Sequence, residues 1–371
     1  MLKYVFAFLI IAIAWAVVLL LALPWWIAVA VTAFVLFVLL GLFLYRRYKA
    51  LKAAREIEKA LNAQAEEQAR SARPEQQAEV RALQAEFNRA VGALKSSKLG
   101  RSGAEALYAL PWYVIIGPPG AGKTTALRNS GLQFPYLNAQ SGGGVKGVGG
   151  TRNCEWFLSN EGVLLDTAGR YATEDDDRDE WFAFLDLLKK TRARKPINGL
   201  ILAVNVTEIG TAREAQIEGV VRKLRERIDE VQNRLQVALP VYVLFTKCDL
   251  IQGFSEFFTD LRKNDRGQIW GFTVPLAQQP ESASNFFAER FDQMARTVEQ
   301  RSLKRISTEL NLGARENIYQ FPQQFQSLKQ NLAEFIGALF ASNAYQSSPL
   351  LRGVYFTSGT QEGRPIDQLA E

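Results

Sequence analysis

A glycine-rich stretch between Trp112 and Ser130 contains the residues whose types and spacing point most directly to chemistry. It reads WYVIIGPPGAGKTTALRNS and includes the full G-x-x-x-x-G-K-T pattern of a phosphate-binding loop. An apolar β-branched run precedes the pattern and a helix-forming run follows it, which is the context that the motif requires. Glycines let backbone N–H groups turn toward phosphate oxygens, and the positive end of the helix dipole adds to the attraction. The stretch predicts a nucleoside triphosphate site.

Each position of this loop has an expected role. Lys123 would neutralise the β- and γ-phosphates, and the Thr124 hydroxyl would bind Mg²⁺. The other residues expected to contact the nucleotide here are Gly117, Pro118, Pro119, Gly120, Ala121, Gly122 and Thr125. The alternative is a glycine-rich turn with a chance lysine, which the flanking strand and helix disfavour.

A second motif, DTAGR, follows the apolar strand predicted over Val163–Asp166. Asp166 could reach Mg²⁺ through water, and Gly169 would let its backbone N–H meet the γ-phosphate, as in segments that order on triphosphate binding. The motif alone is weak evidence for a nucleotide site, but its position after a phosphate loop makes the evidence strong. Between the two motifs lies the glycine-rich segment Ser141–Gly150, a flexible loop or a switch loop. Thr151 closes it and is a candidate second Mg²⁺ ligand.

A third motif, TKCD, follows the strand predicted over Val241–Phe245. The Asp249 carboxylate could accept hydrogen bonds from guanine N1–H and the 2-amino group. Adenine offers neither donor there, so Asp249 favours GTP over ATP. A final predicted strand, Val354–Phe356, ends in a TSG sequence that fits a loop closing over the base. The candidate base-binding residues are Thr246, Lys247, Asp249, Thr357, Ser358 and Gly359.

Composition limits the other classes of function. The chain of 371 residues contains no histidine, which excludes His-based triads and His-ligated metals. Cys154 and Cys248 lack metal-site or disulfide spacing. The formal net charge of +6 comes from interspersed charges, and no dense basic patch with aromatic residues appears. We therefore expect no nucleic-acid partner.

The first 48 residues predict a transmembrane hairpin. Tyr4–Leu23 and Ile27–Leu44 are apolar runs, each long enough for a bilayer core, with Pro24 as the turn between them. A cleaved signal peptide or one bent helix is the alternative. Basic residues flank both spans, and the positive-inside rule then places both ends in the cytoplasm. These residues are Lys3, Arg46, Arg47, Lys49 and Lys52.

Residues 49–110 predict a helical connector, because Lys52–Arg73 is rich in helix formers and an apolar stripe follows Pro74. The stripe consists of Val80, Leu83, Phe87, Val91 and Leu94. It could pack on the domain that follows, or it could bind a partner helix.

Residues 111–371 predict an α/β P-loop NTPase (GTPase-like) domain with a helical insertion at about 250–350. Beyond the strands given above, we expect strands over Tyr113–Ile116, Asn153–Leu158, Gly199–Val204 and Ile269–Val274. Helices are expected over Asp175–Lys190, Glu208–Val237, Phe254–Leu261, Phe286–Leu310 and Phe325–Ala341.

The hairpin and the four motifs together resemble one family closely, the IcmF/TssM inner-membrane components of bacterial type VI secretion systems. The resemblance extends to NSGLQFP, GGGVKGVGGTRNCEWF and GVYFTSGTQEG, and it covers essentially the whole chain. It implies a trans-envelope complex, homo-oligomeric when assembled, with a TssL-like inner-membrane partner and baseplate proteins on the cytoplasmic side. Family members continue into a periplasmic region that meets a TssJ-like lipoprotein. The chain stops at Glu371, so we expect it to be a fragment or a truncated form without that region.

One departure from the usual GTPase sequence pattern affects the expected mechanism. Many Ras-like GTPases place a water-orienting glutamine directly after the D-x-x-G glycine, where this chain has Arg170. Hydrolysis should then be slow or depend on another group. Arg170 or Arg152 could stabilise charge in cis, or each could be a surface or salt-bridging residue. The candidate catalytic residues are Lys123, Asp166 and Arg170.

The leading hypothesis is a membrane-anchored, nucleotide-dependent switch or slow NTPase that supports assembly or gating of a secretion complex, with GTP (or ATP) and Mg²⁺ as cofactors. A structural scaffold with a non-hydrolysing nucleotide site is a second possibility. A signal-recognition-type targeting GTPase shares DTAGR and TKxD, but the two-span anchor counts against it. An ABC ATPase is disfavoured because no catalytic Glu follows Asp166.

Overall fold

The computed structural model describes the chain over residues 77–96, 106–134, 154–173, 178–262, 265–277, 279–342 and 348–359, with scattered positions between 20 and 41. Most of the predicted hairpin, the first part of the connector, the glycine-rich segment and Thr151 lie outside the described residues. The chain divides into one unit over Met1–Gln68 and another over Ala69–Glu371, and the second is described below. Within the described residues, no helix is both long and apolar enough to cross a membrane.

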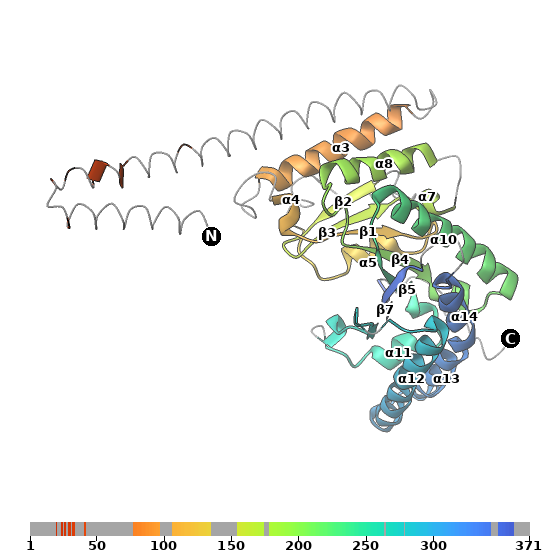
Figure 1. Cartoon of the computed structure of the whole chain (residues 1–371). Helices are drawn as coiled ribbons and strands as arrows, with labels where there is room; N and C mark the ends of the chain where they lie inside the picture. The colour runs from red at the N-terminus through yellow and green to blue at the C-terminus, as the bar shows by residue number, and fades with distance from the viewer. Residues whose placement is uncertain are drawn as a thin grey trace. The chain divides into compact units, whose positions relative to one another are not determined.

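The core of the second unit is a mixed sheet of seven strands in the order β2-β3-β1-β4-β5-β7-β6 (Figure 1). The strands are β1 Trp112–Ile116, β2 Cys154–Leu158, β3 Val163–Thr167, β4 Gly199–Asn205, β5 Pro240–Thr246, β6 Gly271–Thr273 and β7 Leu350–Phe356. The central strands run parallel, and β2 and β6 pair antiparallel at the two edges. The predicted α/β sheet is confirmed. Ligands of such sheets bind at the carboxyl ends of the parallel strands.

Helices cover both faces of the sheet. The described helices of this unit are α3 Gln77–Ser96, α4 Ala106–Ala109, α5 Lys123–Arg128, α7 Arg170–Thr173, α8 Arg178–Thr191, α9 Val206–Gly210, α10 Glu214–Leu235, α11 Phe254–Phe258, α12 Ala283–Thr308, α13 Leu312–Ser327 and α14 Lys329–Leu339. Successive side chains of β1 point to opposite faces of the sheet, which divides the core into two parts. Val114 and Ile116 belong to the large hydrophobic cluster that also contains residues of α8 and α10. Ile115 instead packs with Leu127 of α5 on the opposite face.

Helix α3 packs on the sheet through the apolar stripe seen in the sequence. The Phe87 ring meets the Trp156 ring edge-on with centroids 5.0 Å apart, and Trp156 meets Trp112 in the same way at 5.4 Å. Val91 is also buried in this core. For these residues, the interpretation of the stripe as a packing surface agrees with the structure.

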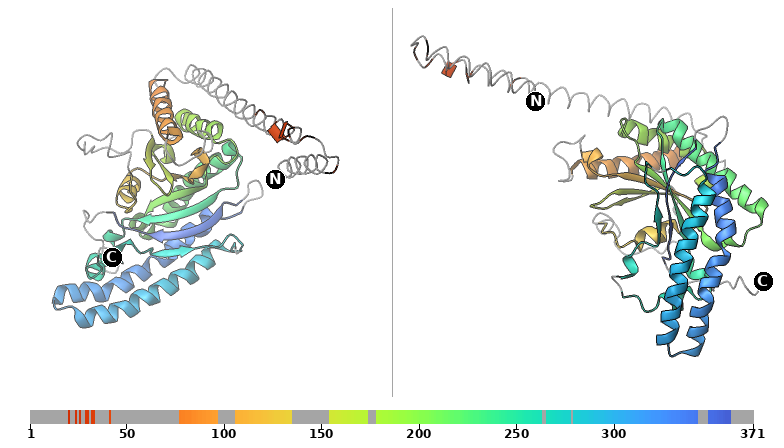
Figure 2. Two further views of the ribbon diagram at one scale, coloured as in Figure 1. Left: turned by 90° about the vertical axis from the view of Figure 1, so that its left-hand side faces the viewer. Right: turned by 60° about the horizontal axis from the view of Figure 1, so that its bottom comes forward.

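Between β6 and β7, helix α12 runs beside α13 and α14 and forms a long helical hairpin (Figure 2). The predicted helix over Phe325–Ala341 was incomplete, because α13 begins at Leu312 and a break at Leu328 separates it from α14. The Asn311 side chain caps α13 by accepting from Ala314 N at 3.1 Å.

A second difference concerns the helix predicted over Glu208–Val237. The structure divides it into α9 and α10, with a turn at residues 211–213. The Asn331 amide of α14 donates to Gly210 O at 2.8 Å and to Ala212 O at 3.0 Å, which satisfies carbonyls at this turn. A contact from a distant helix therefore stabilises the break.

Candidate nucleotide-binding site

The phosphate loop leaves β1 at the carboxyl edge of the sheet and enters α5. Gly120 and Gly122 have φ of 73° and 75°, a left-handed conformation that favours glycine. Gly117 is needed for another reason: a Cβ at this position would lie 2.1 Å from Ala203 O of β4. The glycines of the motif therefore fit both the turn and its close approach to the neighbouring strand.

Lys123 begins α5 and turns back over the loop. Its Nζ donates to Gly117 O at 2.8 Å and to Pro118 O at 3.0 Å. The side chain is buried, and burial lowers the pKa of Lys123 below its ordinary value, while the Asp166 carboxylate acts in the opposite direction. Since the ammonium sits among carbonyls with little solvent, a phosphate in the loop would stabilise its charge.

Thr124 and Asp166 come from different motifs and are hydrogen bonded, with Thr124 Oγ1 donating to Asp166 Oδ2. The parallel pairing of β1 and β3 sets Ile115 opposite Asp166 and so fixes the carboxylate beside the loop. The neighbouring Thr167 hydroxyl donates to Ile115 O at 2.7 Å. The two predicted Mg²⁺ ligands that the structure describes are thus brought together.

Gly169 of the DTAGR motif lies against the phosphate loop. A Cβ added to it would be 2.5 Å from Pro119 Cα and 2.7 Å from Pro119 N. Only glycine allows the two backbones to approach this closely. The DTAGR segment therefore lies in direct contact with the phosphate loop.

The TKCD motif at the end of β5 meets the phosphate loop from the other side. The Thr246 hydroxyl donates to Ala121 O at 2.7 Å and also contacts Val204 O at 3.1 Å. A Cβ at Gly122 would lie 4.0 Å from Lys247 Cγ. The aliphatic stem of Lys247 thus lies beside the loop. The backbone of Lys247 is left-handed, with φ of 58°.

Asp249 is largely buried, and the TSG segment after β7 holds it in place. Ser358 Oγ donates to Asp249 Oδ1. The backbone of Thr357 is tied to the end of β5, since its N–H donates to Phe245 O at 2.8 Å and its carbonyl accepts from Cys248 N at 3.2 Å. The predicted base-binding motifs form one structural unit.

The last residue of this unit, Gly359, reaches α5. Asn129 Nδ2 donates to Gly359 O at 2.6 Å, and a Cβ at Gly359 would lie 2.8 Å from Thr125 Cγ2. The loop after β7 therefore closes against the helix that follows the phosphate loop. Thr125 acts here as a packing residue for that loop.

Arg170, the third candidate catalytic residue, is paired with a buried acid. Its Nη2 lies 2.7 Å from Glu180 Oε2, and Tyr171 Oη donates to the same oxygen at 2.7 Å. Glu180 is fully buried on α8. This geometry agrees with the salt-bridging alternative considered for Arg170, and it ties the DTAGR segment to α8.

The described residues contain no group of three or more Cys, Asp or Glu side chains placed to hold a metal ion. The predicted Mg²⁺ site differs from such a cluster, because a hydroxyl and one carboxylate would share the ion with phosphate oxygens and water. Thr151 and Arg152 lie outside the described residues.

The sequence analysis missed a polar pair at the same edge. Asn205 ends β4 in register with Thr246, and its Nδ2 donates to Glu208 Oε1 at 2.9 Å. Glu208 lines a pocket together with Pro118 of the phosphate loop. An Asn followed three residues later by Glu, directly after a buried strand, resembles a helix-capping pattern and could have signalled the pair.

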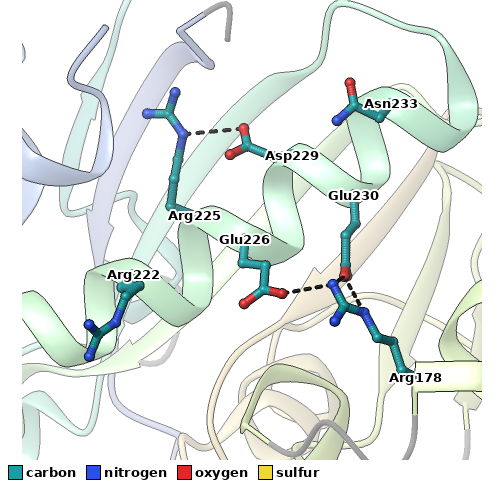
Figure 3. Close-up of a pocket in the computed structure, with 7 residues that line it drawn as sticks. All are labelled: Arg178, Arg222, Arg225, Glu226, Asp229, Glu230 and Asn233. Atoms are coloured by element: carbon teal, nitrogen blue, oxygen red, sulfur yellow. Dashed lines mark hydrogen bonds and ion pairs between the residues drawn. The ribbon is translucent and has the colours of Figure 1, made fainter. Parts of the chain in front are cut away.

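A separate pocket of about 390 Å³, drawn in Figure 3, lies along α10. In it, Arg178 from the start of α8 points toward Glu226 and Glu230 of α10, with N–O distances of 2.8 and 2.7 Å. Arg225 of α10 pairs with Asp229 of the same helix at 3.3 Å. The Arg178 ion pairs join α8 to α10, whereas the pair of Arg225 and Asp229 lies within α10. The phosphate-loop residues do not line this pocket.

Comparison with known proteins identifies the family. The profile of the IcmF-related N-terminal domain matches residues 174–371. The chain belongs to the IcmF-related family. It is 45% identical over 297 residues to the type VI secretion system component TssM1 of Pseudomonas aeruginosa. The match covers 78% of this chain but only 27% of that relative. The predicted membership of the IcmF/TssM family is confirmed.

Solved structures give weaker likenesses. A GTP-binding protein of Sulfolobus solfataricus in complex with GDP is 17% identical, with a TM-score of 0.21, and the match covers 39% of this chain and 38% of that one. The signal recognition particle receptor SRb-GTP/SRX complex of Chaetomium thermophilum is 14% identical, with a TM-score of 0.26, over 52% of this chain and 81% of that one. At these TM-scores the likenesses support no conclusion about the IcmF-related chain.

Proposed function

We propose that this IcmF-related chain binds GTP with Mg²⁺ at the carboxyl edge of its sheet and hydrolyses it slowly. The observation that carries the proposal is the hydrogen bond between Thr124 and Asp166. It joins a phosphate-loop hydroxyl to a strand-end carboxylate, the two protein groups that P-loop NTPases place around Mg²⁺. Lys123 would meet the β- and γ-phosphates, where its buried ammonium lies among loop carbonyls.

The residues present fit a guanine nucleotide. Gly169 approaches Pro119 closely enough for its N–H to serve a γ-phosphate held by the loop. Asp249 is oriented by Ser358 and can accept two hydrogen bonds from guanine. An adenine base would offer this largely buried carboxylate neither of the two hydrogen bonds that guanine donates, which costs affinity. GTP is therefore preferred over ATP.

We also propose that the chain is part of a core membrane complex of a bacterial type VI secretion system. Family membership and the similarity to TssM1 support this role. Residues 1–48 would form two spans in the inner membrane, with both ends cytoplasmic. A TssL-like protein, baseplate proteins and further copies of the chain would be its partners there. A TssJ-like lipoprotein would be reached through a periplasmic region of the longer relatives.

The test is a nucleotide titration of the full chain in mild detergent with GTP and ATP, followed in parallel by phosphate release. Lys123→Ala removes the phosphate-loop ammonium, and the exposed Lys195→Ala is its matched control. We expect GTP to bind more tightly than ATP, Lys123→Ala to abolish binding, and Lys195→Ala to leave it unchanged. Binding without phosphate release would favour a scaffold with a structural nucleotide. Absence of binding to the wild-type chain would reject the proposed nucleotide site.

A further inference from the structure

A half-open pocket of about 400 Å³ borders the phosphate loop on the side of α9 and the start of α10. Its partly exposed apolar residues are Pro118, Ala212 and Val220, and polar groups come from Glu208 and Gln216. Among the described residues that line it, the one charged side chain is the Glu208 carboxylate. An apolar wall with a single carboxylate is complementary to a cation on an aliphatic stem.

Glu208 is exposed, yet its carboxylate has a fixed partner. Asn205, only 4% exposed, donates from Nδ2 to Glu208 Oε1 at 2.9 Å. The Asn205 amide is itself oriented, because its Oδ1 accepts from Thr207 N at 3.1 Å and from Thr207 Oγ1 at 3.0 Å. A buried amide therefore holds the acid beside the phosphate loop before anything binds, which reduces the cost of ordering it.

The wall of the pocket is also fixed from outside. Asn331 of α14 donates to the carbonyls of Gly210 and Ala212 at the turn between α9 and α10. Ala212 is itself a lining residue. The long helical hairpin between β6 and β7 thus supports the pocket directly.

GTP hydrolysis at the nucleotide site would be accelerated by a cation, and this pocket is suited to bind one. The transition state of phosphoryl transfer carries negative charge spread over the phosphate oxygens, and an arginine supplied in cis or in trans stabilises this charge. Arg170 stands next to the DTAGR glycine but is paired with buried Glu180 at 2.7 Å. Moving Arg170 to the phosphates would leave Glu180 as a buried charge without that cation, which is costly.

We propose that the pocket receives an arginine or lysine side chain of a partner protein, and that this cation accelerates GTP hydrolysis. The stem would lie on the apolar wall and the charged head beside Glu208, next to the phosphate loop. In the reaction, water attacks the γ-phosphorus and the bond to the β–γ bridging oxygen breaks. GDP leaves with the electron pair. One proton of the water passes to an oxygen of the released phosphate, and the other stays on the oxygen that has bonded to phosphorus. The inference rests on the proposed GTP hydrolysis.

The test uses the full chain in detergent with Nα-acetyl-arginine amide as the probe and its neutral analogue Nα-acetyl-citrulline amide as the control. Saturation-transfer NMR measures probe binding, and phosphate release at saturating GTP measures the rate. Glu208→Gln removes the charge of the pocket. Glu218→Gln, at an exposed glutamate of α10 that does not line the pocket, is the matched variant. Fluorescent GTP binding and thermal unfolding are recorded for every sample.

We expect the arginine probe, and not the citrulline probe, to bind and to raise the rate at least about tenfold, a small part of the 10³- to 10⁵-fold effect of a positioned arginine. Both effects should disappear in Glu208→Gln and persist in Glu218→Gln. Equal responses to the two probes, an unchanged response in Glu208→Gln, or binding without acceleration would each overturn the inference while GTP binding stands. A wild-type chain that binds no GTP would overturn the proposed function as well.

Discussion

Ser358 and Asp249 stand 109 residues apart in the sequence and are joined by a hydrogen bond from the serine hydroxyl to the carboxylate. The helical hairpin lies between them along the chain, yet β5 and β7 are adjacent parallel strands. Their carboxyl ends therefore bring the two residues to one point. The carboxylate expected to read the base is oriented by the segment that follows β7.

Replacing Ser358 by alanine tests this relationship. A hydrogen bond to a charged group contributes about 1.5–3 kcal/mol, so Ser358→Ala should weaken GTP binding about tenfold or more. ATP, which offers no donor to Asp249, should bind as weakly as before. Fluorescent nucleotide titration measures both affinities, and Ser255→Ala on α11 is the control. Equal losses for GTP and ATP would show that Ser358 does not act through base recognition.

Gly169→Ala tests the close approach of the two loops. The new Cβ would collide with Pro119, 2.5 Å from its Cα, so the DTAGR segment must move away from the phosphate loop. We expect GTP affinity to fall at least about tenfold, which corresponds to a loss of about 1.4 kcal/mol of binding free energy. Gly219→Ala is a matched control inside α10, where a Cβ meets nothing within 4 Å. It should raise stability by up to about 1 kcal/mol and leave binding intact.

The pH dependence of stability should report on Tyr171. Burial and the nearby Glu180 carboxylate raise the pKa of Tyr171 far above its ordinary value of 10.0. Above pH 10 the unfolded chain releases this proton and the folded chain keeps it. The folded state then binds more protons, so stability falls as pH rises, by about 1.4 kcal/mol per pH unit.

Urea unfolding of the wild type and Tyr171→Phe at pH 9, 10 and 11 measures this effect. The phenylalanine variant loses a hydrogen bond and should be less stable at pH 9. The difference between the two chains should shrink by about 1 kcal/mol between pH 10 and pH 11. Parallel pH profiles would contradict the buried, neutral phenol.

Asn331 should link the helical hairpin to the turn beside the phosphate loop. Asn331→Ala removes the donor to Gly210 O and Ala212 O and should destabilise the chain by about 1–3 kcal/mol. Amide hydrogen exchange should increase at residues 206–213, where α9 and its turn lose support. The neighbouring exposed Gln330→Ala is the control. Unchanged exchange at this turn would show that the hairpin does not stabilise it.

The sequence by itself determined the local units that carry the candidate chemistry. The strand before the phosphate loop and the strands ending in DTAGR and TKCD were all predictable. Glycine placement, β-branched runs and motif spacing are properties of short segments, and neighbouring residues decide them. The family could also be predicted, because the apolar N-terminal runs, the four motifs and the segments NSGLQFP and GVYFTSGTQEG occur together in one chain.

Only the tertiary structure decided which side chains those motifs meet. Arg170 pairs with Glu180, Glu208 is held by Asn205, and Asn331 supports the turn that divides one predicted helix into α9 and α10. Local propensity favoured an unbroken helix there, but it does not account for a hydrogen bond from a helix more than a hundred residues away. Packing of the sheet and its helices fixes such contacts, and they determine which charged groups remain available at the phosphate loop.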